Sequence, residues 1–217
     1  MSNPREEKVS KRETPLSMAL TDQKSASKAT PMDAFLLAKK YWLNCQRLNL
    51  GSMAEELGVS RATLFRWIGN KDLLMGEIIW SVYKPTVLYA RQECKSQGVD
   101  YVVDVFREVN IQILNSKPLR HFLVSDGQYA LSIISSKNST FHSRMVELNT
   151  ELLQQEVDRG AIKPYMSIDS MSYFMVRIGE SCTFSEVILD QEPDLDQLED
   201  ACKAVRILLG GKPQVEV

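Results

Sequence analysis

The sequence predicts an all-α protein, and three observations carry that prediction. Apolar residues recur every three or four positions through most of residues 31–209, which is the spacing of one helix face. Ser, Thr or Asn precedes many of these runs and glycine follows several of them, as expected for helix starts and stops. No stretch alternates apolar and polar residues as a half-buried strand does.

Length and composition are those of a globular protein of one or two domains. The chain has 217 residues, of which 44% are hydrophobic and 25% charged. No apolar run approaches the roughly 20 residues that a membrane-spanning helix needs, and the polar N-terminus lacks the apolar segment of a secretory signal. We therefore expect a cytoplasmic protein.

Charge is divided unevenly along the chain. Residues 1–75 hold 12 Lys and Arg against 8 Asp and Glu, whereas residues 76–217 hold 14 against 20. The overall net charge of −2 therefore combines a basic N-terminal part with an acidic remainder. A basic N-terminal part is compatible with binding phosphate backbones there, and its modest excess favours a dimer that presents two such parts.

The same patterns divide the chain into four segments. Residues 1–30 are rich in Ser, Thr, Lys and Glu without sustained apolar periodicity, so we expect a disordered tail. Residues 31–75 form a compact helical module, residues 76–210 a larger helical domain, and residues 211–217 a C-terminal tail.

The first predicted helix spans residues 31–48. Thr30 is a suitable N-cap and Pro31 suits the first helical position. Its apolar stripe, which we expect to pack on the following helices, consists of Ala34, Phe35, Ala38, Tyr41, Trp42, Cys45 and Leu48.

Two short helices joined by a glycine turn follow. Ser52 and Glu55 have the spacing of a capping box, which predicts that the first short helix begins at Ser52. Gly58 can adopt the left-handed conformation of a sharp turn, and Ser60 is a good N-cap for the second helix. Asn70 can cap a third helix that begins at Lys71.

This arrangement predicts a helix-turn-helix whose second helix enters the DNA major groove. Helical hairpins with a glycine turn are common, but here the apolar and cap positions all fall at the spacings that a helix-turn-helix requires. We expect Arg61→Ala to relax base preference and Lys71→Ala to weaken binding to all sequences alike. The predicted DNA-binding residues are Ser52, Ser60, Arg61, Thr63, Phe65, Arg66, Trp67 and Lys71.

The helix that starts after Asn70 extends towards Gln97 and Gly98 and contains Pro85. Because proline removes a helical hydrogen bond, we expect a kink or a break there. Such a kink would be a candidate point for transmitting a signal, or it would have no regulatory role.

Six further helices complete the prediction. Their ranges are 100–115, 118–124, 128–134, 140–159, 167–187 and 194–209. In the first of them the predicted inward set is Val102, Val103, Phe106, Val109, Ile113 and Leu114.

Nothing in the sequence indicates a metal, a cofactor or a catalytic centre. The four cysteines and two histidines are scattered and do not cluster as zinc ligands do, so buried free thiols are expected. The chain lacks a phosphate loop and a Ser/His/Asp set.

Candidate ligand-binding residues lie in the larger domain. Arg177 and Glu180 are three residues apart in a helix that is apolar on several faces, so they form a structural ion pair or contact a ligand. Trp80, Phe122, Tyr129, Tyr173 and Phe174 are candidate pocket walls, with ordinary core packing as the alternative.

The N-terminal motifs resemble those of TetR-type repressors. The residues concerned are Gly58-Val59-Ser60, Thr63-Leu64-Phe65 and Lys71-Asp72-Leu73-Leu74, with Phe65 where the family usually has Tyr. Further on, residues 176–181 and Glu192-Pro193-Asp194 resemble the C-terminal domain of QsdR-type TetR regulators. The resemblance implies a homodimer through the last two helices, a ligand pocket in each larger domain, and a small, lactone-like effector.

Together these observations predict a transcriptional regulator rather than an enzyme. We expect a repressor that binds a near-palindromic DNA operator as a homodimer and is released when an effector changes the spacing of the two recognition helices. The alternatives are a dimeric DNA-binding regulator without a small-molecule ligand and, less in keeping with the residues, an enzyme built on a helical bundle.

Overall fold

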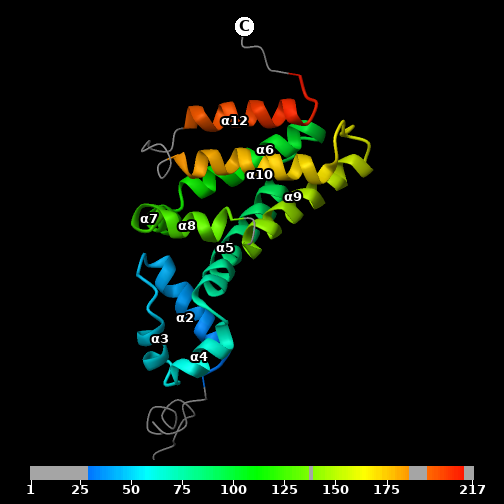
Figure 1. Cartoon of the computed structure of the whole chain (residues 1–217). Coiled ribbons are helices and arrows are strands. Elements are labelled where there is room, and N and C mark those ends of the chain that lie inside the picture. Colours follow the sequence, from blue (N-terminus) through cyan, green and yellow to red (C-terminus); the bar gives the residue numbers. More distant parts are fainter. Residues whose placement is uncertain (1–28, 137–138, 186–194, 213–217) are drawn as a thin grey trace, which may run out of the picture.

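The computed structural model describes residues 29–136, 139–185 and 195–212, and these residues form helices and no strands. Three helices gather at one end of the molecule: α2 (Pro31–Leu43), α3 (Leu50–Glu56) and α4 (Arg61–Ile68) (Figure 1). From there α5 (Lys71–Glu93) runs into the larger helical part. The all-α prediction is confirmed.

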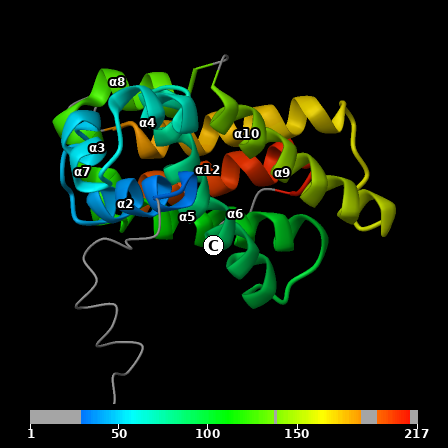
Figure 2. The ribbon, with the colours of Figure 1, turned by 90° about the horizontal axis from the view of Figure 1, so that it is seen from below.

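The larger part contains six more described helices. They are α6 (Gly98–Leu114), α7 (Lys117–Ser125), α8 (Gly127–Ile134), α9 (Thr140–Asp158), α10 (Ile168–Thr183) and α12 (Leu195–Leu208). The last two pack on each other and run side by side across the molecule, as the view from below also shows (Figure 2). α12 lies at the end farthest from α3 and α4 (Figure 1).

Short polar side chains determine where several helices begin. The Thr30 side chain accepts from the Asp33 amide and Asp33 bonds back to Thr30, which completes a capping box at the start of α2. Ser60 caps α4 and Asn70 caps α5, as predicted. The predicted start at Ser52 is wrong. Asn49 caps α3, its Oδ1 accepting from the amides of Gly51 and Ser52, so Ser52 lies within the helix.

Helix α5 continues through Pro85 without a break. The proline removes one backbone donor, at a cost of about 3 kcal/mol in a helix interior. Ile78 and Ile79 before it and Val87 and Ala90 after it are all buried, and packing on both sides supplies most of a helix's stability. The expected boundary between the N-terminal module and the larger domain, at residues 75 and 76, therefore falls within the continuous helix α5.

The remaining helix ends differ from the prediction by a few residues. α2 ends at Leu43 rather than at Leu48, and α6 begins at Gly98. Within α6, Val105 is buried although it was not in the predicted inward set. α6 has neighbours on more than one side, since it contacts α5, α9, α10 and α12. The predicted continuation of α10 beyond residue 185 lies outside the described residues.

Two clusters of buried side chains form the core. One joins α2–α4 to the first half of α5 and to α7, α8 and the start of α9. The other joins the second half of α5 to α6, α9, α10 and α12. Trp80, Tyr83 and Ile113 pack against both clusters, which therefore meet near the middle of α5. No helix among the described residues is both long and apolar enough to cross a membrane.

Candidate DNA-binding face and internal cavity

Helices α3 and α4 form a helix-turn-helix with a buried inner side. Met53 and Leu64 are fully buried. Gly58 has a φ of +65°, and the Val59 amide after it donates to the Ala54 carbonyl over 2.9 Å, which closes the turn. The turn and the apolar contacts together orient α4 so that its opposite side faces solvent.

The solvent side of α4 carries Arg61, Phe65 and Arg66, all exposed. Ser60 and Thr63 bond to each other, because the Ser60 hydroxyl accepts from the Thr63 amide over 3.1 Å and lies 3.0 Å from its hydroxyl. Trp67 packs instead against the N-terminal core, and Ser52 is exposed on α3. The geometry thus separates the predicted DNA-binding residues into free arginines, a capping pair and a half-buried tryptophan.

Lys71, at the start of α5, contacts the larger part of the molecule. Its Nζ lies 4.8 Å from the ring centre of Tyr129 on α8. The Tyr129 hydroxyl donates to Oδ1 of the neighbouring Asp72 over 2.8 Å. Burial and this hydrogen bond raise the pKa of Tyr129 well above its ordinary value, so the tyrosine stays a donor. α8 therefore holds the first turn of α5, next to the helix-turn-helix.

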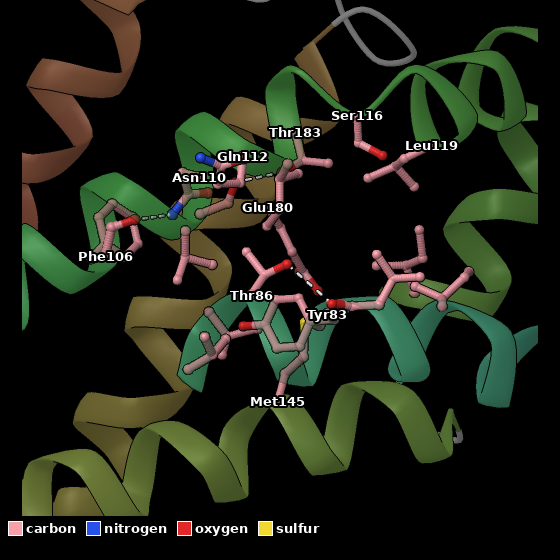
Figure 3. A pocket seen from close by; sticks show the side chains of 18 of the residues that line it. Tyr83, Thr86, Phe106, Asn110, Gln112, Ser116, Leu119, Met145, Glu180 and Thr183 are labelled. Atoms are coloured by element: carbon pink, nitrogen blue, oxygen red, sulfur yellow. Dashed lines mark hydrogen bonds between the residues drawn. The ribbon is translucent and has the colours of Figure 1, made fainter. Parts of the chain in front are cut away.

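A cavity of about 110 Å³ lies where the two core clusters meet, between α5, α6, α9 and α10 (Figure 3). Its walls are mostly apolar, from Val82, Val105, Phe106, Leu119, Phe141 and Met145. An apolar cavity of about 150 Å³ can hold a benzene-sized molecule. The described cavity accordingly fits a small apolar group, with a few polar atoms to orient it.

The polar groups at the cavity differ in how many of their hydrogen-bonding atoms already have a partner within the protein. Thr86 and Thr183 donate to the carbonyls of Val82 and Gly179 in their own helices. Asn110 donates to the Phe106 carbonyl over 2.8 Å, which leaves its side-chain oxygen as an available acceptor (Figure 3). Burial raises the pKa of Tyr83 to about 12, so its hydroxyl remains protonated.

Glu180 brings a buried carboxylate to the same cavity. Its Oε2 accepts from Arg177 over 2.6 Å and from the Ser135 hydroxyl over 2.9 Å, and its Oε1 lies 3.2 Å from His142 Nδ1. Arg177 also donates to the Tyr173 hydroxyl over 3.1 Å. Glu180 and Arg177 thus form the ion pair that their spacing permits, and Glu180 is the member that reaches the cavity wall.

The cavity shares one residue with the seven ligand-binding candidates chosen from the sequence, namely Glu180. Trp80 lies beside the cavity. The centre of its ring is 6.1 Å from that of the Tyr83 ring and 6.2 Å from that of the Phe141 ring. Phe122 and Tyr129 contact each other at α7 and α8. Tyr173 and Phe174 are exposed, and Arg177 is half-buried outside the lining. Sequence reasoning missed the polar wall residues, although one signal for Asn110 was present: an amide within an otherwise apolar helix face.

Comparison with known proteins gives consistent results. Residues 97–209 match the family described as Tetracyclin repressor-like, C-terminal domain. The solved structure of the R. erythropolis transcriptional repressor QsdR, from the TetR family, superposes with a TM-score of 0.78 and 26% sequence identity, covering 86% of this chain and 97% of that one.

A second solved structure, a putative TetR-family transcriptional regulator from Rhodococcus sp., shares the fold. Its TM-score is 0.52 at 16% identity, and the match covers 82% of this chain and 98% of that one. No curated protein sequence matches the chain.

Proposed function

This chain belongs to the TetR family of transcriptional regulators, and from that premise we propose that it is a cytoplasmic repressor. It binds a near-palindromic operator as a homodimer and leaves the DNA when a small effector occupies the internal cavity. The observation that carries the proposal is the solvent side of α4, where Arg61 and Arg66 are exposed while the opposite side is buried by Leu64.

The first part of the proposal is DNA binding by α4. A helix of this kind reads base edges with side chains from its exposed side, and arginine is the residue that most often contacts guanine. Arg66 is exposed and makes no hydrogen bond or ion pair with a described residue, so its guanidinium is available to bases.

The second part is dimerisation through α10 and α12. Phe174 on α10 is 47% exposed and Ile207 on α12 is 55% exposed. Large apolar side chains that are exposed on two neighbouring helices favour an interaction surface. A two-fold dimer would present two copies of α4, which matches a near-palindromic site.

The third part is an effector that enters the cavity. The apolar walls and the small volume favour a short acyl chain, and the Asn110 oxygen and Tyr83 hydroxyl supply the few polar contacts that a ligand pocket needs. A lactone with an apolar chain has this character. Support for a lactone in particular comes from the resemblance to QsdR-type regulators.

A contact route between cavity and DNA-binding end supports the proposed release. Ile134 of α8 lines the cavity, and Tyr129 of the same helix holds Asp72 and Lys71. An effector that displaces α8 would therefore move the start of α5. The ligand need only bind the displaced state more tightly than the DNA-bound state.

Selection of duplexes from a random library by the full-length protein tests the DNA-binding part. We expect enrichment of a near-palindrome whose half-sites are about one or more helical turns apart. Failure to enrich any sequence at moderate salt would contradict the proposed function.

Release from the selected duplex tests the effector part. Acyl lactones are compared with their ring-opened acids, which keep the chain but lose the ring. We expect only the closed lactones to release the DNA and raise the melting temperature. A protein that binds its duplex but responds to no ligand would instead be a regulator without an effector.

A further inference from the structure

A charged hollow opens on the helix-turn-helix module, apart from the internal cavity. It has a volume of about 730 Å³ and lies between the segment that precedes α3 and the first residues of α4 and α5. Its lining includes Arg47, Asn49, Leu50, Arg61, Phe65 and Lys71. Three of these residues are cations that come from three separate segments of the chain.

Among the residues that the structure describes, no acidic side chain lines the hollow. Arg47 and Arg61 form no hydrogen bond or ion pair with any other residue that the structure describes. Like charges gathered without a counter-ion repel one another, and an anion placed between them removes this cost. Arginine is also well matched to phosphate oxygens, which it can bind with two parallel N–H donors.

Arg61 lies back towards the start of α3. A Cβ at Gly51 would be 3.4 Å from Arg61 Nη2 and 3.1 Å from Asn49 Oδ1. The absence of a side chain at residue 51 therefore makes room for the guanidinium beside the Asn49 cap. Because the Gly51 and Ser52 amides already donate to Asn49 Oδ1, the anion would be held by the arginine side chains and not by these backbone donors.

Lys71 forms the side of the hollow that faces the larger domain. Its Nζ is retained above the ring of Tyr129, and Lys71 lines the same hollow as the two arginines.

We propose that this hollow binds one phosphodiester group of the DNA backbone, with Arg47 and Arg61 as its ligands. The inference rests on the proposed function and refines it. Arg61, expected from the sequence to read bases, positions the backbone instead, and base preference falls to Arg66. Arg47, in the segment between α2 and α3, becomes a DNA contact that the helix-turn-helix pattern did not indicate.

The test measures DNA affinity of the full-length protein and of Arg47→Gln, Arg61→Gln and the double variant. Lys163→Gln, which removes an exposed charge in the larger domain, is the matched control. The duplex selected by the wild-type protein and a scrambled duplex of equal composition are compared at salt concentrations between about 0.1 and 0.3 M. Circular dichroism verifies that each variant is folded.

We expect each single variant to lose about 5- to 10-fold affinity on both duplexes, and the slope of log K against log salt to fall by about one. Two arginines on one phosphate should make the double variant lose less than the product of the single losses. Arg66→Gln should instead reduce the preference for the selected duplex.

Two results would overturn the inference while leaving the proposed function intact. One is an unchanged affinity of Arg47→Gln, relative to the wild type, for the selected duplex. The other is an Arg61→Gln loss confined to the selected duplex. A third arm replaces chloride with inorganic phosphate at equal ionic strength. We expect unchanged affinity, whereas strong competition would mean that the hollow is a site for a free anion.

Discussion

Replacing Glu180 with alanine removes a carboxylate that is 9% exposed and has three partners. His142 Nδ1, itself buried, would lose its contact with Oε1, and Ser135 would lose its acceptor. Arg177 would lose its ion pair at 2.6 Å but is 33% exposed and can regain water. Breaking a buried ion pair typically costs about 3–5 kcal/mol, and because Arg177 is partly exposed we expect about 3 kcal/mol.

Glu199→Ala is the matched control, since Glu199 also pairs with an arginine. Both of its oxygens lie 2.9 Å from Arg107, but the Glu199 side chain is 48% exposed. An exposed pair contributes about 0–1 kcal/mol. The two variants should therefore differ by at least about 2 kcal/mol, or roughly 30-fold in the unfolding equilibrium.

Urea unfolding at fixed protein concentration measures this difference, because the midpoint shifts at constant slope when only stability changes. Glu180→Gln retains the shape of the side chain and part of its hydrogen bonding, so its loss of unfolding free energy should lie between those of Glu180→Ala and Glu199→Ala. A Glu180→Ala cost within about 1 kcal/mol of the Glu199→Ala cost would refute the reasoning that burial governs the strength of this pair.

Three further changes test other parts of the structure. Tyr129→Phe removes the hydrogen bond to Asp72 but keeps the ring, so amide exchange should accelerate in the first turn of α5 and stay unchanged in α12. Gly98→Ala should cost more stability than Gly58→Ala. Both glycines have positive φ, but a Cβ at Gly98 would lie 2.9 Å from the Ala161 carbonyl, whereas one at Gly58 meets nothing within 4 Å. Burial raises the pKa of Cys202 to about 11, so a thiol reagent at about pH 8 should modify Cys202 only on unfolding. The stability from this buried thiol is present below its ordinary pKa near 9 and is lost as the pH rises towards 11.

The start of α3 illustrates how far local signals reach. Both Asn49 and Ser52 are good N-cap residues, and the sequence pattern favoured Ser52 because Glu55 follows it. In the fold Leu48 is buried and Leu50 packs against the core, which places the helix start between them at Asn49. Packing outside the four-residue window thus decided between two equivalent caps.

The internal cavity was less accessible to prediction than the helix-turn-helix. Helical periodicity identifies buried positions, but it does not distinguish a buried side chain that packs against another from one that borders empty space. Phe122 and Glu180 were both expected to be inward and both are buried, yet Glu180 alone of the pair lines the cavity. The difference depends on how α5, α6 and α10 meet.

Local sequence patterns suffice to predict the helical class, the turn at Gly58 and the caps at Ser60 and Asn70, because these features depend on residues within about one helical turn of each other. The partners of the exposed and buried polar groups follow only from the packing of the helices. Tyr129 meets Asp72 from 57 positions away, and Ser135 meets Glu180 from 45. Contacts over such separations follow from the packing of whole helices, which residue spacing along one helix does not encode.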